Sequence, residues 1–140
     1  MKERNNLAVR KHSGAVLRAG LEYLEARGEL PYDTVLVPAP TRAHVARSRG
    51  GDPVTDMCKA TGRSVAPVLS MGKHIADQSD LGALDRRRNL AGRVHVSDIP
   101  QGKILLVDDV VTTGSTLQTA AESLIGRGSE VVGALVLAAA

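Results

Sequence analysis

The chain has 140 residues, 43% of them hydrophobic, a length that suits one domain with a single core. Its formal net charge is only +3, so the composition does not demand a nucleic-acid ligand. Cys58 is the sole cysteine, which excludes a disulfide framework and a zinc site built from cysteines. The polar start predicts no signal peptide, and no apolar stretch is long enough to span a membrane.

The first third of the chain predicts a helix, a strand and an irregular loop. Apolar residues at helical spacing indicate a helix over residues 14–27, with Ser13 as its cap and Gly28 as its end. Residues 34–37 have the composition of a strand. The prolines that follow this strand force an irregular loop at its carboxyl end.

The middle of the chain predicts a second helix, another strand and a long loop. Asp52 and Pro53 begin a helix that Gly62 ends. A strand is expected over residues 64–69, and apolar periodicity is then lost over residues 70–92. A loop of that length in a small domain is usually functional or disordered. We expect it either to serve a site or to be a solvated basic turn.

The most informative segment begins with a short apolar run. Four consecutive apolar residues, Ile104 to Val107, predict a parallel strand buried on both faces. Asp108 and Asp109 follow at the carboxyl end, where open α/β sheets bind ligands. Carboxylates accept hydrogen bonds from vicinal sugar hydroxyls and favour a nearby hydrated Mg²⁺. The pair therefore predicts a sugar site.

A phosphate-sized loop follows the two carboxylates. Its hydroxyl and backbone N–H groups are donors, and Gly114 lets the backbone approach an anion. Residues 117–125 have helical spacing, so the loop lies at a helix N-terminus whose dipole favours the same anion. Residues 130–137 predict the next strand. The alternative is that Asp109 or Ser115 simply caps the helix. The predicted phosphate-binding residues are Thr112, Thr113, Gly114, Ser115 and Thr116.

This motif resembles the signature of the type I phosphoribosyltransferases, which binds phosphoribosyl pyrophosphate (PRPP). The wider pattern resembles the ComF family over roughly four-fifths of the chain. That family has a Pro-Val-Pro segment, basic residues, an Arg-Gly pair, a Gln and an Arg-Arg-Xaa-Asn segment before the signature. Its N-terminal zinc module has no counterpart in this chain. The matching segments are Pro38-Ala39-Pro40, Arg42, Arg49-Gly50, Gln78, Arg87-Arg88-Asn89 and residues 107–116.

The resemblance implies an α/β fold of the type I phosphoribosyltransferase kind. This fold is a mainly parallel sheet with helices on both faces and a mobile hood loop, here residues 70–92, in a single domain over residues 1–140. Asp108, Asp109 and Arg42 are implied as catalytic residues, and the alternative for Arg42 is a place on a solvated helix face. The residues implied in pyrophosphate binding and the hood are Pro38, Ala39, Pro40, Thr41, Gln78, Arg87 and Asn89.

The resemblance further implies transfer of phosphoribose from PRPP to an unknown acceptor, with release of pyrophosphate. Mg²⁺ would be held by PRPP and water near Asp108 and Asp109, without direct protein ligands. Two alternatives stay open: a regulator that binds PRPP without turnover, and an accessory protein in competence and DNA uptake. The chain has only two aromatic residues, Tyr23 and Tyr32, for stacking a base. We expect a cytoplasmic protein without membrane contact or a direct nucleic-acid ligand, and leave open whether it forms a homodimer.

Overall fold

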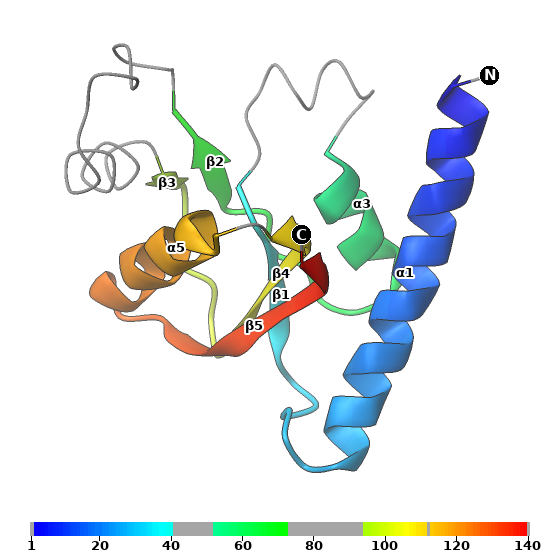
Figure 1. Ribbon diagram of the computed structural model, residues 1–140. Coiled ribbons are helices and arrows are strands. Elements are labelled where there is room, and N and C mark those ends of the chain that lie inside the picture. The colour runs from blue at the N-terminus through cyan, green and yellow to red at the C-terminus, as the bar shows by residue number, and fades with distance from the viewer. Residues whose placement is uncertain (1, 41–51, 73–93, 112, 140) are drawn as a thin grey trace.

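The computed structural model describes residues 2–40, 52–72, 94–111 and 113–139, with side chains from residue 12 onward. Figure 1 shows a central sheet with helices on both faces. Among these residues, no helix has the length and apolar character that a membrane span needs. The elements are α1 (Lys2–Ala26), β1 (Val35–Pro38), α3 (Pro53–Ala60), β2 (Leu69–Met71), β3 (Val94–Val96), β4 (Lys103–Val111), α5 (Ser115–Gly126) and β5 (Glu130–Ala139).

The central strand of the main sheet is β4. It pairs in parallel with β1 on one edge and with β5 on the other, which gives the order β1-β4-β5. A parallel bridge from Leu36 to Val65 extends the sheet beyond β1. Because β4 has strands on both edges and helices over both faces, its core-facing residues must be apolar. The α/β fold with a mainly parallel sheet, as expected from the sequence, is confirmed.

The side chains of β4 alternate between two hydrophobic clusters. Leu105 and Val107 pack with residues of α1 and α3. Ile104 and Leu106 pack with residues of α5 on the opposite face. All four are at most 3% exposed, and burial of such a side chain contributes about 1.5–3 kcal/mol. The strand that leads to the predicted site is therefore the most firmly held part of the sheet.

The first helix is longer than the sequence predicts. The expected start near residue 14 with Ser13 as a cap is wrong, because α1 begins at Lys2 and Ser13 lies within it. The preceding Lys, Glu, Arg, Leu and Ala residues are good helix formers, so a residue suited to a cap did not mark the start. The predicted end at Gly28 is confirmed. Gly28 has φ of 72°, and the N–H of Glu29 donates to the carbonyl of Leu24 at 2.9 Å, as in a Schellman motif.

The region after α3 differs from the prediction. The expected strand over residues 64–69 is wrong except at Val65, which forms the bridge, and at Leu69, which begins β2. Instead β2 pairs antiparallel with β3 as a separate two-stranded sheet. Pro67 has no N–H to donate, so a continuous ladder across it is disfavoured. The predicted hood segment over residues 70–92 begins in β2 and otherwise lies almost wholly outside the described residues.

Helices α1 and α3 pack closely where two small residues meet. A methyl group added at Gly14 would lie 2.7 Å from the Cβ of Ala60, which is closer than van der Waals contact allows. A methyl group at Gly20, further along the same helix, would lie 3.6 Å from Leu135 Cδ2. That second distance is an ordinary contact. The two glycines therefore offer a matched test of the packing.

We expect Gly14→Ala to destabilise the protein by about 1–3 kcal/mol, because the added methyl must push α1 and α3 apart. Gly20→Ala should stabilise it by up to about 1 kcal/mol through the higher helix propensity of alanine. Urea unfolding of both variants measures the difference. Equal effects of the two substitutions would contradict the packing described here.

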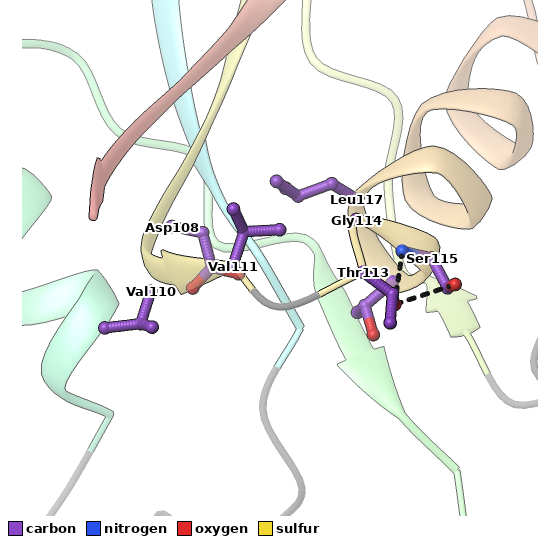
Figure 2. A pocket seen from close by; sticks show the side chains of 8 residues that line it. Asp108, Val110, Val111, Thr113, Gly114, Ser115 and Leu117 are labelled. Atoms are coloured by element: carbon purple, nitrogen blue, oxygen red, sulfur yellow. Dashed lines mark hydrogen bonds between the residues drawn. The ribbon is translucent and has the colours of Figure 1, made fainter. Parts of the chain in front are cut away.

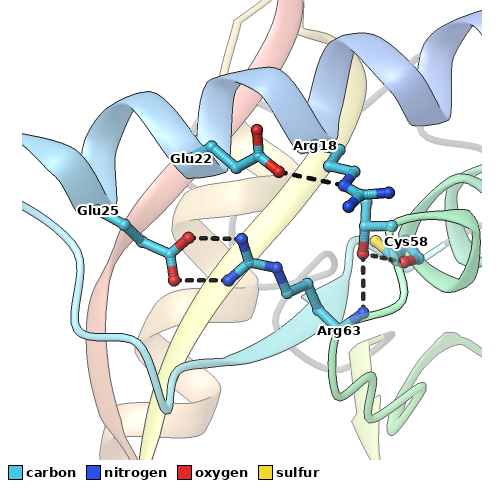
Figure 3. Close-up of polar contacts among 6 residues, drawn as sticks. Arg18, Glu22, Glu25, Cys58 and Arg63 are labelled. Atoms are coloured by element: carbon cyan, nitrogen blue, oxygen red, sulfur yellow. Dashed lines mark hydrogen bonds and ion pairs between the residues drawn. The ribbon is translucent and has the colours of Figure 1, made fainter.

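A buried ion pair connects the C-terminal part of α1 to the segment after α3 (Figure 3). The guanidinium of Arg63 donates through two nitrogens to both carboxylate oxygens of Glu25. The Glu25 side chain is 3% exposed and that of Arg63 is 26% exposed. Hydrogen bonding from Arg63 lowers the pKa of Glu25, and burial opposes that effect. Arg18 and Glu22 form a second pair that is well exposed.

We expect Arg63→Ala to cost about 2–4 kcal/mol at pH 7, because it leaves the buried Glu25 carboxylate without its partner. Arg18→Ala should cost less than about 1 kcal/mol, since its pair lies in solvent. The pKa of Glu25 is lowered on folding, so its stabilisation exists above pH 4.5 and is lost as the pH falls further. Denaturation at pH 7 and pH 3 should therefore show the Arg63→Ala penalty shrinking in acid. A penalty of the same size at both pH values would refute this role.

Candidate functional site

Both predicted carboxylates lie inside the β4 ladder. Asp108 pairs with Val136 of β5, and the ladder continues as far as Val111. The prediction that the strand ends before the two acids is therefore wrong. The reason is β5, a strand of ten residues that pairs with β4 as far as Val111. The other partner, β1, ends opposite Val107. The two acids consequently stand on a paired strand at the carboxyl edge of the sheet.

Each carboxylate is held by the N–H group of the next residue. The N–H of Asp109 donates to Oδ1 of Asp108 at 2.8 Å, and the N–H of Val110 donates to Oδ1 of Asp109 at 2.8 Å. These bonds restrict the rotation of both side chains. Each carboxylate keeps further lone pairs for a ligand, since an ionised carboxylate has about four acceptor positions.

Asp108 is harder to ionise than an ordinary aspartate. The pKa of its carboxyl is raised from 3.8 to about 6, and burial is the largest cause. A hydrogen bond with the Asp109 side chain and the negative charges of Asp109 and Asp52 also raise it, whereas the bond from the Asp109 N–H opposes the rise. A ligand that donates hydrogen bonds or brings positive charge would favour the ionised form.

The turn after β4 places hydrogen-bond donors near Asp108 (Figure 2). Gly114 has φ of 79° and ψ of 1°, a left-handed conformation that glycine adopts without a Cβ penalty. Oγ1 of Thr113 accepts from the N–H of Ser115 at 3.2 Å and donates to Oγ of Ser115 at 2.9 Å. Helix α5 begins here, and its first bond runs from the N–H of Gln118 to the carbonyl of Gly114 at 2.9 Å.

The N-cap of α5 is Gly114, which has no side chain to cap the helix. The alternative that Asp109 or Ser115 caps this helix is therefore wrong. The first N–H groups of any helix lack partners within the helix, and the helix dipole adds partial positive charge at this end. The N-terminus of α5 is accordingly suited to an anion.

One open pocket joins the carboxylate and the donors (Figure 2). Asp108 lies on one side of it, and the turn with the first residues of α5 lies on the other. Such a pocket can accept hydrogen bonds from hydroxyl groups at one end and hold an anion at the other. Its lining residues are Asp108, Val110, Val111, Thr113, Gly114, Ser115, Thr116 and Leu117.

The end of β1 lies next to this part of β4. Pro38 pairs with Val107, and the N–H of Ala39 donates to the carbonyl of Val107 at 2.8 Å. The predicted segment Pro38-Ala39-Pro40 therefore leaves the sheet beside Asp108. The other predicted site residues lie outside the described part of the chain, namely Thr41, Arg42, Gln78, Arg87, Asn89 and Thr112.

Asp52 does not line the pocket, but its charge acts on Asp108, a connection that sequence reasoning missed. It is the N-cap of α3, where Oδ1 accepts from the N–H groups of Val54 at 3.1 Å and Thr55 at 3.4 Å. Val54 shares a core cluster with Val107, the residue before Asp108. The Asp52 charge raises the pKa of Asp108. The Asp-Pro pair in the sequence signals a helix start, but not that the helix starts near the end of β4.

The residues at the pocket fit Mg²⁺ as an indirect partner. Carboxylate oxygens are the hard ligands that Mg²⁺ prefers, and Mg²⁺ usually keeps several waters. No group of three or more His, Cys, Asp or Glu residues suited to a metal occurs in the described ranges. The Asp108 carboxylate thus suits a hydrated ion that enters with a phosphate ligand.

Cys58 is no candidate nucleophile. It is fully buried in the cluster between α1, α3 and β4. Burial, followed by the Asp52 charge, raises the pKa of its thiol to about 12, so the reactive thiolate is suppressed. Cys58 is thus a small buried residue of the core.

The parallel sheet with a pocket after its central strand is typical of α/β proteins that bind ligands at the carboxyl edge. Residues 55–140 match the phosphoribosyl transferase domain family. The chain therefore belongs to the phosphoribosyltransferase family, of the type I or ComF kind. This match contains β4, the turn, α5 and β5, which carry the pocket. The resemblance seen in the sequence is confirmed.

Three known proteins are similar in sequence to this chain. The chain is 40% identical over 69 residues to Competence protein F of Haemophilus influenzae, covering 46% of this chain and 30% of that protein. It is 33% identical over 122 residues to DNA utilization protein YhgH of Escherichia coli O157:H7, covering 80% and 53%. It is 27% identical over 140 residues to ribose-phosphate pyrophosphokinase of Caulobacter vibrioides, covering 94% and 44%. The chain thus spans about a third to a half of the length of these relatives.

A solved structure of low sequence identity is also similar. Hypoxanthine phosphoribosyltransferase from Staphylococcus aureus matches with a TM-score of 0.49 and 17% identity, covering 97% of this chain and 62% of that chain. The fold class itself follows from the parallel sheet and from the family match.

Because the pKa of Asp108 is raised on folding, ionisation of this carboxyl lowers the stability of the folded protein. The folded protein binds the proton more tightly than the unfolded chain, so stability falls as the pH rises from 3.8 through about 6. We expect Asp108→Asn to be more stable than the wild type at pH 7.5 by about 1 kcal/mol, allowing for solvent screening of a half-buried group. The gain should disappear below pH 4.

Urea denaturation at pH 4 and pH 7.5 measures this difference. Asp33→Asn is the control, because it removes the same charge from an exposed position before β1. A gain of equal size at both pH values, or a loss at pH 7.5, would show that the Asp108 carboxylate carries no such cost.

Proposed function

We propose that the chain binds PRPP together with Mg²⁺ and transfers its phosphoribosyl group to an acceptor, releasing pyrophosphate. The observation that carries the proposal is the single pocket that joins the Asp108 carboxylate to the N-terminus of α5. A ligand matching both ends must carry hydroxyl groups and an anionic group a short distance apart. A ribose phosphate has both features, and membership of the phosphoribosyltransferase family supports the same ligand.

The described residues have distinct tasks in this proposal. Asp108 and Asp109 accept hydrogen bonds from the ribose hydroxyls and so position the sugar. The hydroxyls and N–H groups from Thr113 to Thr116 donate to the 5′-phosphate, and the α5 dipole adds to that attraction. Bond breaking at the anomeric carbon places positive charge on the sugar, and the nearby carboxylates stabilise it. Mg²⁺ bound with PRPP supplies positive charge to the departing pyrophosphate.

The residues outside the described ranges complete the proposal. Arg42 is proposed to bind the pyrophosphate, with Gln78, Arg87 and Asn89 in a hood that excludes water. Thr112 is proposed to add a hydroxyl donor at the phosphate end. We further propose that residues 1–140 act as one domain in this reaction.

A second candidate is a regulator that binds PRPP without turning it over. It is favoured by the position of the two aromatic residues of the chain. Tyr23, on α1, is 60% exposed, and Tyr32, before β1, is 78% exposed. No aromatic ring lines the pocket in the described part of the chain. A nucleobase acceptor would therefore lack a stacking partner from these residues. The names of two relatives also support a third candidate, an accessory role in competence and DNA use.

Calorimetric titration of PRPP with and without Mg²⁺ tests the proposed ligand. We expect saturable binding with Mg²⁺. The double variant Asp108→Asn, Asp109→Asn should weaken that binding at least about tenfold, because each hydrogen bond to a charged group contributes about 1.5–3 kcal/mol. The Asp33→Asn variant is a control for the loss of negative charge elsewhere. Failure of the folded wild type to bind the Mg²⁺ complex would reject both the enzyme and the regulator.

Pyrophosphate release separates these two candidates. A panel of nitrogen bases and amines is incubated with PRPP, Mg²⁺ and the protein, and pyrophosphate is measured. Acceptor-dependent release that the double variant abolishes supports the transferase. Saturable PRPP binding without release for any acceptor in the panel supports the regulator.

A further inference from the structure

The edge of the main sheet at β5 is open and almost uncharged. Among the described residues, β5 is the last strand in the order β1-β4-β5 and pairs only with β4. Its one charged residue is Glu130, the first of its ten residues. The opposite edge differs, because the bridge between Leu36 and Val65 covers part of β1. An apolar edge strand presents unpaired N–H and C=O groups and is a template for pairing with another strand.

A bulge confines this edge to the second part of β5. Ile104 of β4 pairs with Val131 and the next residue, Leu105, pairs with Gly133, so Val132 is the extra residue. A bulge interrupts pairing locally. From Gly133 to the end of the strand the ladder has no further shift. Antiparallel pairing of this part with itself would form roughly seven hydrogen bonds, at about one per residue pair, which lies within the range of a specific protein interface.

An apolar side of α1 adjoins the same edge. A methyl group at Gly20 would lie 3.6 Å from Leu135 Cδ2, so this side of α1 faces β5. Val16 and Tyr23 lie four residues before and three residues after Gly20, and residues at these spacings share one side of a helix. They are 45% and 60% exposed. The open strand edge and the exposed side of α1 therefore form one continuous surface.

We propose that a second copy of this chain covers this surface, with the two β5 strands paired antiparallel across a two-fold axis. The charges favour this arrangement, because antiparallel pairing separates the two Glu130 side chains to opposite ends, whereas parallel pairing would place them side by side. A two-fold axis perpendicular to the sheet keeps both α1 helices on one face, with their Val16 and Tyr23 sides toward each other. One symmetry operation thus buries both parts of the surface and closes at two copies.

This pairing would support the strand that carries the candidate site. β1 ends opposite Val107, so β5 is the partner that β4 has beside Asp108 in the described structure. A second copy would make β5 an interior strand and so hold the end of β4 more firmly. The inference concerns a surface outside the pocket, and it does not depend on the ligand proposed above.

Lysine substitutions at exposed positions test the surface. Ala134→Lys places a charge on the strand edge, and Val16→Lys places one on the adjoining side of α1. Ala15→Lys is the matched control, because Ala15 is exposed on the same helix but lies about 140° around its axis from Gly20. Circular dichroism confirms that each variant is folded. Sedimentation velocity over a range of protein concentrations then measures the monomer–dimer equilibrium.

We expect the wild type to form a dimer, and Ala134→Lys and Val16→Lys each to raise its Kd at least about tenfold, since lysine on an edge prevents pairing and each dimer carries two substitutions. Ala15→Lys should keep the wild-type Kd. Hydrogen exchange gives a second measure. Amides between Gly133 and Ala139 should exchange faster when the wild type is diluted below its Kd, as hydrogen bonds between the copies are lost.

Three results would overturn the inference. A wild type that stays monomeric at about 100 μM would show that a second copy does not cover this surface, since only weaker association would then be possible. A dimer that survives either Ala134→Lys or Val16→Lys would place its interface elsewhere. Equal weakening by Ala15→Lys would indicate a general effect of added charge. None of these results bears on PRPP binding, which is measured separately.

Discussion

The burial of β4 is the constraint on which the rest of the structure depends. Its apolar residues from Ile104 to Val107 fill two clusters at once, one beneath α1 and α3 and the other beneath α5. Parallel partners on both edges fix its register. Because this strand cannot shift without exposing one cluster, the residues that follow it have a fixed position. Asp108 and Asp109 thus emerge at the carboxyl edge on a strand that is paired on both sides and buried on both faces.

The pocket combines two opposite electrostatic environments over a short length of chain. Asp108 resists ionisation because burial and neighbouring acids disfavour its charge. A few residues later, Gly114 turns the backbone and α5 begins with N–H groups that favour an anion. Gly114, in its left-handed conformation, lies between these two environments as the N-cap of α5. The raised pKa of Asp108 lowers the stability of the folded protein at neutral pH. A ligand that donates hydrogen bonds to this carboxylate would reduce that loss of stability.

Much of the fold could be predicted from local patterns, and the errors have two causes. The buried strand, the glycine stops at Gly28 and Gly62, and β5 follow from apolar runs and turn residues. The start of α1 was misplaced because Ser13 has the chemistry of a cap but lies within a helix. The β2–β3 pair was missed because its strands are short and far apart in the sequence. In each case a contact with a distant segment, or the propensity of the neighbouring residues, outweighed the local signal.

The sequence by itself determined the chemistry of the predicted site: two adjacent acids, of which Asp108 lines the pocket, a run of hydroxyl residues with a glycine, and a helix after them. These features are contiguous in the chain, so their proximity needs no folding to establish. Tertiary structure alone decided what surrounds them. It extended β4 through both acids by pairing them with β5, and it led Pro38-Ala39-Pro40 out of the sheet beside Asp108. It also packed α3 against β4 so that Asp52 acts on Asp108, because buried apolar contacts join segments that the sequence holds more than fifty residues apart.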